Sequence, residues 1–158
     1  MTAIRVTLAR DDDAWTIAEM SRRLIEHGLP WSWDEQRVRR AMRHPEGVVI
    51  TARDRRRLAG FAVMEFYDEH AHLCLLAVHP GYRKQGVGRR LLEWLEATAR
   101  TAGIFRVNLE LRIGNAGARE FYRKLGYRES GVRLAYYAGR EDALRMTRDL
   151  TVVPTSQS

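Results

Sequence analysis

The sequence predicts one α/β domain, a sandwich of helices around a mixed β-sheet. Three observations lead to this prediction. Segments with the two-residue period of strands alternate with segments of helical period, in the order β-α-α-β-β-β-α-β-α-β-β. The chain of 158 residues is long enough to bury the core of one domain. No repeat or linker divides it. We therefore expect a single domain over residues 1–150 and a flexible tail at 151–158.

In the N-terminal half, periodicity and turn residues mark the elements. Alternating apolar side chains predict half-buried strands, and apolar side chains three and four residues apart predict helices packed by one face. The acidic run Asp11–Asp13 suits the first turn of a helix. Ser32 followed by Glu35 is a capping-box pattern, with Ser32 as the capping residue. The predicted elements are a strand at 4–8, a helix at 14–25, a helix from Ser32 to about Arg43, and a strand pair at 48–52 and 58–66.

The stretch from Leu73 to Leu92 organises the second half of the chain. Its apolar run predicts a strand buried on both faces, and a Pro-Gly turn and a basic loop lead from this strand into a long helix. Gly126 suits the end of a later helix, which Asn115 would cap. The predicted elements are a strand at 73–78, a helix from Val87 to near Gly103, a strand at 106–112, a helix from Asn115 to Leu125, and a strand pair at 132–137 and 143–150.

The composition limits the compartment and the partners. No apolar stretch approaches the roughly 20 residues that span a bilayer, and the N terminus has no signal-peptide core. We therefore expect a cytoplasmic protein that does not enter a membrane. The single cysteine, Cys74, excludes an internal disulfide. A formal net charge of +7 favours an anionic partner, which nucleic acid, an anionic membrane or a polyphosphate cofactor would all satisfy.

The loop between the strand at 73–78 and the following helix has the features of a pyrophosphate site. It runs Arg83-Lys84-Gln85-Gly86-Val87-Gly88-Arg89, without the Lys-Ser/Thr pair of a Walker A loop and without the third glycine of the dinucleotide fingerprint. The first N–H groups of a helix favour an anion, and glycines let the backbone approach it. The alternative is a tight turn whose basic residues are merely solvated.

Two further positions could supply acid–base chemistry. The strand at 106–112 carries polar side chains on one face, and Glu110 could be a general base if that face lines a cleft rather than the surface. Tyr122 lies on the apolar face of its helix, where it is either a core residue or a general acid.

Other candidates are less informative. Cys74 is expected to be a small core side chain. His70 and His72 share one face of a strand but have no third ligand, so no metal site is expected. The arginines at 53 and 55–57 form a hairpin tip that is ordinarily solvated. Trp31 and Trp33 could pin a helix start or form the wall of an acceptor groove.

These motifs together resemble the GNAT family of N-acetyltransferases over residues 4–150. The acetyl-CoA signature of that family, Gln/Arg-x-x-Gly-x-Gly/Ala, is similar to the segment from Arg83 to Gly88. Its later Asn-x-x-Ala-x-x-x-Tyr-x-x-x-Gly-Phe/Tyr pattern is similar to the segment from Asn115 to Tyr127. The resemblance implies an α/β/α sandwich around a mixed, mostly antiparallel, splayed sheet, and an enzyme that takes acetyl-CoA as co-substrate without a metal.

The resemblance also implies roles for single residues. Glu110 would be the base, acting directly or through a water, and Tyr122 the acid. The backbone N–H of Val78 would stabilise the oxyanion. The residues implied to bind the cofactor are Leu76, Ala77, Val78, Arg83, Lys84, Gln85, Gly86, Val87, Gly88, Arg89 and Asn115.

Within the family, the chain most resembles RimI-like enzymes, which acetylate the N-terminal amine of a ribosomal protein. The segment from Leu109 to Asn115, the pair Tyr136-Tyr137 and the segment 139–143 carry this likeness. Leu75 and His79 depart from the Asn and Asp common there. A protein N terminus, a small-molecule amine such as a polyamine, amino acid or antibiotic, and a non-catalytic acyl-CoA sensor therefore remain alternatives. Nucleic-acid binding is not expected, because no groove-reading or base-stacking motif accompanies the charge. A monomer and a homodimer both remain open.

Overall fold

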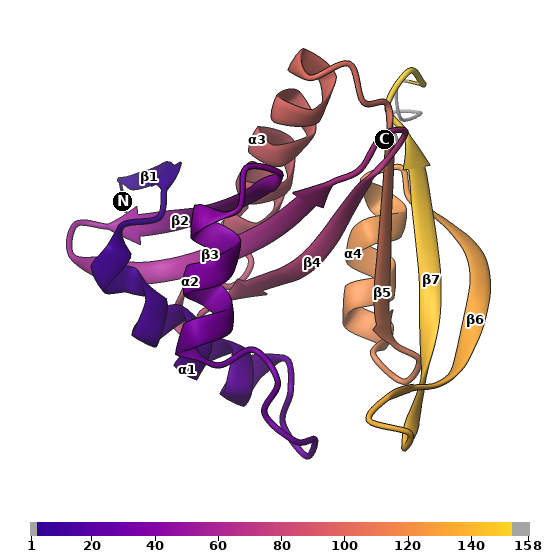
Figure 1. Ribbon diagram of the computed structural model, residues 1–158, viewed down its shortest axis with the longest axis horizontal. Coiled ribbons are helices and arrows are strands. Elements are labelled where there is room, and N and C mark those ends of the chain that lie inside the picture. Colours follow the sequence, from indigo (N-terminus) through magenta and orange to yellow (C-terminus); the bar gives the residue numbers. More distant parts are fainter. Residues whose placement is uncertain (1–2, 153–158) are drawn as a thin grey trace.

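A seven-stranded sheet with four helices forms the fold (Figure 1). The structure is a computed structural model that describes residues 3–152. The strand order is β1-β2-β3-β4-β5-β7-β6, and every neighbouring pair is antiparallel except β4 and β5. The elements are β1 (Ile4–Leu8), α1 (Ala14–Leu24), α2 (Glu35–Arg43), β2 (Gly47–Asp54), β3 (Arg57–Phe66), β4 (Ala71–Val78), α3 (Val87–Thr101), β5 (Arg106–Arg112), α4 (Ala116–Lys124), β6 (Arg128–Tyr137) and β7 (Glu141–Asp149).

The helices cover both faces of the sheet, which gives two cores. Helices α1 and α2 pack on one face, around Ile17, Val38 and Phe61. Helices α3 and α4 pack on the other face, around Leu91, Leu95 and Tyr122. The predicted α/β sandwich around a mixed, mostly antiparallel sheet is confirmed. Strands β1 and β5 have the predicted bounds, whereas β6 begins at Arg128 instead of residue 132. Of the expected tail at 151–158, residues 153–158 lie outside the described part of the chain.

Strand β4 contributes side chains to the cores on both faces of the sheet, and its burial alternates along the strand. Ala71, Leu73, Leu75 and Ala77 are buried, whereas the alternate side chains are half-buried. A register shift opposite Val63 and Met64 lies between Leu73 and Leu75. As a result, Leu73 belongs to the core under α3, and Leu75 belongs to the core under α1 and α2. Because of the bulge, successive buried side chains of β4 switch from one face of the sheet to the other. The switch lies just before residues 76–78, which are predicted to bind the cofactor.

Two predicted local contacts are wrong. The cap of α2 is Asp34, whose Oδ1 accepts a hydrogen bond from the Arg37 N–H at 2.9 Å. The Ser32 hydroxyl instead donates to Oε1 of the buried Glu26 at 2.6 Å. Arg53 is not a solvated hairpin residue, because its guanidinium pairs with the buried carboxylate of Asp13. Only the partner of Arg53 is distant in the sequence, whereas Ser32 and Asp34 both bind residues within six positions.

Candidate active site

The sheet opens between β4 and β5. These parallel strands pair only from Ala71 with Val107 to Leu73 with Leu109, and beyond that point they diverge (Figure 1). The His79 N–H donates to the Ala59 carbonyl on β3 at 2.7 Å. Because alternate amides of a strand point to opposite edges, those of Leu76 and Val78 face the opening. The open edge thus presents backbone donors that no neighbouring strand uses.

At the start of this opening, His72 on β4 meets Glu110 on β5. The His72 Nε2 lies 2.5 Å from the Glu110 Oε2. The Arg133 Nε lies 3.4 Å from the other carboxylate oxygen, Oε1. The Glu110 side chain is 5% exposed and that of His72 is 24% exposed. Glu110 is therefore a nearly buried carboxylate held from both sides.

The pKa of Glu110 reflects opposing effects. Burial, the largest of them, raises it, but the hydrogen bond from His72 and the positive charges of His72, Arg133 and Arg145 lower it. The net effect is a pKa below the ordinary carboxyl value. At neutral pH Glu110 is thus an ionised carboxylate beside an imidazole.

Tyr122 lies in the aromatic cluster that lines the α4 side of the core. Its ring packs edge-on against those of Phe121 and Tyr127, at centroid distances of 5.0 and 5.6 Å. Burial, with a smaller effect from Tyr137, raises the pKa of its phenol. The phenol thus stays protonated at neutral pH and remains a hydrogen-bond donor. Burial is also the main cause of the raised pKa of Tyr137 on β6, with smaller effects from Tyr136 and Glu110.

The loop before α3 has the conformation expected of an anion site. Gly86 is the N-cap of α3 in the left-handed region, with φ 78°, and Lys84 has φ 62°. The side chains of Arg83, Lys84 and Arg89 are exposed around the helix start. The first amides of α3 have no carbonyl of their own helix to bind, and they carry partial positive charge. Val87 belongs to the core, so only its backbone can face a ligand.

Gly88 has a second role that the motif alone does not reveal. A Cβ built on Gly88 would lie 3.1 Å from the Phe121 ring on α4. The glycine therefore lets the start of α3 approach α4 closely. Asn115 caps α4, where its Oδ1 accepts a hydrogen bond from the Ala118 N–H at 3.0 Å. The cap is as expected, and the cofactor contact of Asn115 stays a prediction.

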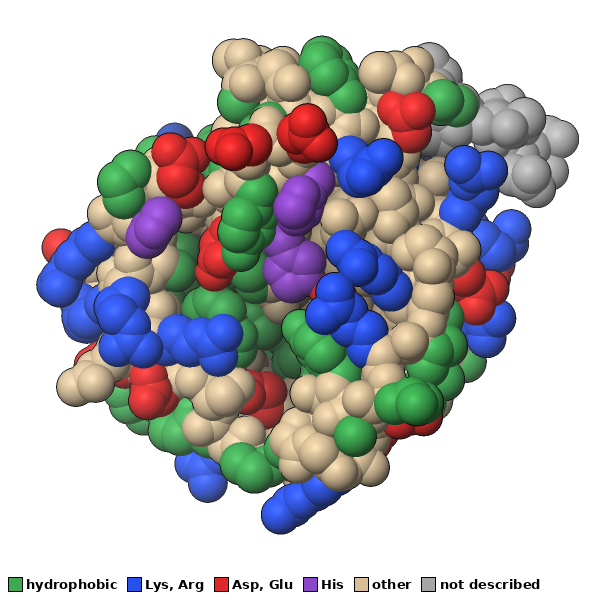
Figure 2. Space-filling view, turned by 45° about the vertical axis from the view of Figure 1, so that its right-hand side comes forward, with side chains coloured by type: hydrophobic (Ala, Val, Ile, Leu, Met, Phe, Trp, Pro, Cys, Tyr) green, Lys and Arg blue, Asp and Glu red, His purple; other side chains and the backbone are tan. Residues whose placement is uncertain are grey.

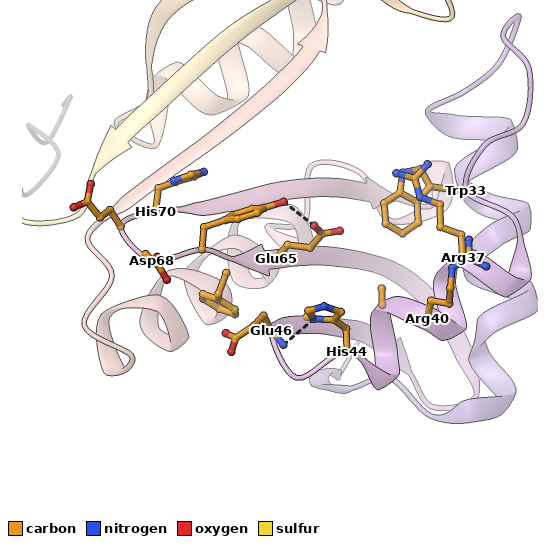
Figure 3. Close-up of a pocket in the computed structure, with 13 residues that line it drawn as sticks. Trp33, Arg37, Arg40, His44, Glu46, Glu65, Asp68 and His70 are labelled. Atoms are coloured by element: carbon orange, nitrogen blue, oxygen red, sulfur yellow. Dashed lines mark hydrogen bonds between the residues drawn. The ribbon is translucent and has the colours of Figure 1, made fainter.

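An open pocket of about 930 Å³ lies between α2, the start of β2 and the end of β3, and Glu65 is among the residues that line it. Arg37 and Arg40 on α2 face Glu65 and the turn between β3 and β4 across it (Figure 3). Glu65 is the cross-strand partner of His72, so the two side chains lie on the same face of the sheet. Trp33 lines the pocket, whereas the Trp31 Nε1 donates to the Ala18 carbonyl at 3.2 Å and ties its loop to α1.

Sequence reasoning missed His72, which was considered only as a metal ligand. His70 lies just before β4 and stacks on Tyr67 instead of sharing the strand with His72. No group that could hold a metal ion occurs within residues 3–152. The signal that could have revealed His72 is its polarity within an apolar strand, but only the pairing of β4 with β5 shows what it contacts.

On one face of the molecule (Figure 2), the basic side chains of the described residues do not form a continuous stripe. On the face in Figure 2, Lys and Arg side chains form separate groups, with His and acidic side chains between them. Cys74 is half-buried, and burial raises the pKa of its thiol, which disfavours a nucleophilic role. Within residues 3–152, no helix has the length and apolar character needed to cross a membrane.

Comparison with known proteins gives consistent matches. The model of the Acetyltransferase (GNAT) family matches residues 12–127. The ribosomal protein bS18-alanine N-acetyltransferase of Salmonella typhimurium is 33% identical over 142 residues, which cover 88% of this chain and 90% of the relative. The N-alpha-acetyltransferase RimI of Mycobacterium tuberculosis is 31% identical over 146 residues, covering 87% of each.

Solved structures share the fold over almost the whole chain. The ribosomal-protein-S18-alanine N-acetyltransferase from Escherichia coli superposes with a TM-score of 0.78 at 27% identity, covering 99% of each chain. Ard1 from Thermoplasma volcanium superposes with a TM-score of 0.83 at 22% identity, covering 94% of this chain and 98% of that one, which is a likeness of fold.

Proposed function

The chain belongs to the acetyltransferase (GNAT) family, and we propose that it transfers the acetyl group of acetyl-CoA to the N-terminal α-amine of a protein. One observation carries the proposal. The His72–Glu110 pair lies at the opening of the sheet, with a cationic helix start at the far end of β4 and an open pocket beside β3. A donor and an extended acceptor could therefore reach the pair from different directions.

We assign the donor to the opening between β4 and β5. The pyrophosphate of acetyl-CoA would lie on the start of α3, among Arg83, Lys84 and Arg89. The pantetheine arm would follow the free edge of β4, where the amides of Leu76 and Val78 offer hydrogen bonds. Ala77 would contribute backbone only, since its side chain belongs to the core under α1 and α2. This arrangement brings the thioester toward Glu110.

The chemistry follows from the same positions. An ammonium has no lone pair, so the acceptor must lose a proton before it attacks the thioester, and the carboxylate of Glu110 favours that loss. The amide of Val78 is proposed to stabilise the oxyanion of the tetrahedral intermediate. The buried phenol of Tyr122 is proposed to protonate the departing thiolate. We further propose that the enzyme works in the cytoplasm.

A protein N terminus is favoured over a small amine because the open pocket includes Glu65, the cross-strand partner of His72. Glu65 belongs both to the pocket and to the strand position opposite His72, so a chain leaving the acetylated residue could run into this space. A small amine would leave it unfilled. The curated relatives named above act on a protein N terminus, which supports the same acceptor class.

A screen for CoA release tests the proposal. Peptides with a free α-amine, the same peptides with a blocked N terminus and a free lysine, and polyamines would be compared at equal concentration. We expect release only with free α-amines, with the acetyl group located there by mass spectrometry, and strong loss in Glu110→Gln. Acetylation of polyamines or lysine in preference to α-amines would refute the proposed acceptor and leave the family assignment intact.

A further inference from the structure

We propose that His72 is the base that takes the proton of the acceptor ammonium, through its Nδ1 atom. In this proposal Glu110 holds the imidazole in the tautomer that has its hydrogen on Nε2 and a lone pair on Nδ1. This inference rests on the proposed function and assigns the proton-accepting atom within the same site. It differs from the expectation that Glu110 itself, directly or through a water, is the base.

The geometry favours the imidazole over the carboxylate as the accessible group. Both oxygens of Glu110 are engaged, Oε2 by His72 at 2.5 Å and Oε1 by Arg133 at 3.4 Å. The carboxylate is also the more buried partner, with 5% of its side chain exposed against 24% for His72. An acceptor amine therefore meets the imidazole more readily than a free carboxylate oxygen.

The contact also determines which ring nitrogen accepts the proton. An ionised carboxylate only accepts hydrogen bonds, so the Nε2 that contacts it carries the hydrogen. In a neutral imidazole the other nitrogen, Nδ1, then keeps a free lone pair. Its neighbour is the Cys74 Sγ at 3.6 Å, a weak donor that does not block it. Carboxylate, imidazole and proton-donating substrate thus stand in the order found in nucleophile–base–carboxylate triads.

Proton affinity points the same way. A protein α-amine ordinarily has a pKa near 8, and the pKa of Glu110 is lowered below its ordinary value. Direct transfer from the ammonium to Glu110 is therefore unfavourable by more than a factor of about 1,000. Imidazoles as a class exchange protons near neutral pH, which is why histidine is the commonest general base.

With this assignment, every proton in the reaction is accounted for. The ammonium gives one proton to Nδ1, and its nitrogen then bonds to the thioester carbon. The C–S bond breaks, and Tyr122 gives a proton to the thiolate. The second proton lost by the nitrogen replaces the one from Tyr122. The imidazolium releases its proton to water, so acetyl-CoA and an ammonium become an amide, CoA and one free proton.

The surroundings of the pair determine how it responds to pH. The charged and titratable groups around the pair are Glu110 on β5, Cys74 on β4, Glu65 on β3, Arg133, Tyr136 and Tyr137 on β6, Arg145 on β7 and Arg37 on α2.

His72→Gln tests the assignment, with His27→Gln as the control that removes an exposed imidazole elsewhere. Rates are measured from pH 5.5 to 9.5 with whichever amine the wild type acetylates best. We expect kcat/KM of His72→Gln to fall about 100-fold at pH 7 and to recover as the acceptor amine itself deprotonates. His27→Gln should keep the wild-type profile, and acetyl-CoA affinity by calorimetry should be unchanged in both.

A second measurement is independent of turnover. In ¹⁵N NMR spectra of the wild type at pH 8, His72 should carry its hydrogen on Nε2, and Glu110→Gln should mix the two tautomers. The assignment would be overturned if His72→Gln had the wild-type rate and the same dependence of rate on pH at low pH. It would also be overturned if His72 of the wild type carried its hydrogen on Nδ1. Wild-type activity on polyamines alone would instead refute the proposed acceptor, without touching the result for His72.

Discussion

Arg112 and Glu141 form a bidentate ion pair at the end of β5 and the start of β7. The Arg112 Nε lies 2.5 Å from Oε2 of Glu141, and one terminal nitrogen of Arg112 lies 3.0 Å from Oε1. The other terminal nitrogen donates to the carbonyls of His27 and Ile25, at 2.7 and 3.3 Å. One guanidinium thus joins β5, β7 and the connection between α1 and α2. Planar two-bond geometry makes arginine hard to replace here.

We expect Arg112→Leu to loosen the α1–α2 connection. The carbonyls of Ile25 and His27 would lose their donor, while Glu26 would still anchor the segment through Ser21 and Ser32. Hydrogen exchange should therefore rise locally over residues 25–33, with the core strands unchanged. Arg23→Leu, which removes an exposed arginine on α1, is the control. Equal hydrogen exchange in wild type and Arg112→Leu would show that the contacts of Arg112 do not stabilise the α1–α2 connection.

A large side chain at Gly86 should abolish acetyl-CoA binding. Gly86 has φ 78° and open space around a built Cβ, so Gly86→Trp would place its ring over the start of α3. Gly103, beyond the other end of the same helix, has φ 79° and the same open space, so Gly103→Trp carries the same backbone strain of about 1 kcal/mol. Calorimetry should show binding of acetyl-CoA weaker by about 100-fold or more only for Gly86→Trp. Equal affinity in the two variants would remove the pyrophosphate site from this loop.

Removal of the Tyr122 hydroxyl should slow turnover without weakening the binding of acetyl-CoA. Tyr122→Phe keeps the ring contacts with Phe121 and Tyr127. If the phenol protonates the thiolate, kcat should fall about 100-fold while the Kd of acetyl-CoA stays within a factor of about two. Tyr127→Phe is the control, because its hydroxyl donates to the buried Glu96 and should affect stability rather than rate. Unchanged kcat in Tyr122→Phe would leave Tyr122 as a core residue.

A buried ion pair between α3 and β7 should contribute strongly to stability. The Arg148 side chain lies 2.8 Å from Oε1 of Glu96, and both side chains are less than 9% exposed. Arg148→Met would leave the carboxylate with only the Tyr127 hydroxyl, at a cost of about 3–5 kcal/mol in unfolding free energy. Arg128→Met, which removes an exposed arginine from β6, is the control for the change in net charge. Denaturant unfolding measures both, and a difference below about 1 kcal/mol would contradict the prediction.

The lowered pKa of Glu110 predicts an acid-sensitive contribution to folding. A carboxyl whose pKa is lower in the folded chain than in the unfolded chain stabilises the fold above the unfolded pKa. That contribution is lost as the pH falls from the ordinary value near 4.5 through the folded pKa. Unfolding free energies measured between pH 6 and pH 3 should therefore fall less steeply in Glu110→Gln. Parallel curves for wild type and variant would show that the pair adds no such stability.

The order of elements and the helix start after Gly86 were predictable from the sequence because their causes are local. The structure has Gly86 as the left-handed N-cap of α3, and Asn115 caps α4 as its spacing predicts. Hydrophobic period gave every strand and helix, with errors only at the ends and at the cap of α2. At the positions that were predicted correctly, each residue interacts with residues only a few places away along the chain.

What remained hidden depends on partners distant in the sequence. The contact of His72 with Glu110 requires β4 and β5 to pair at Leu73 and Leu109 and to separate beyond, and no property of either strand alone specifies that register. Arg53 likewise finds Asp13 only through the packing of α1 on the sheet. The sequence by itself determined the family, the order of strands and helices, and the cap of α4. Only the tertiary structure decided which groups lie together in the candidate site, because side-chain contacts across a sheet depend on strand order and register rather than on spacing along the chain.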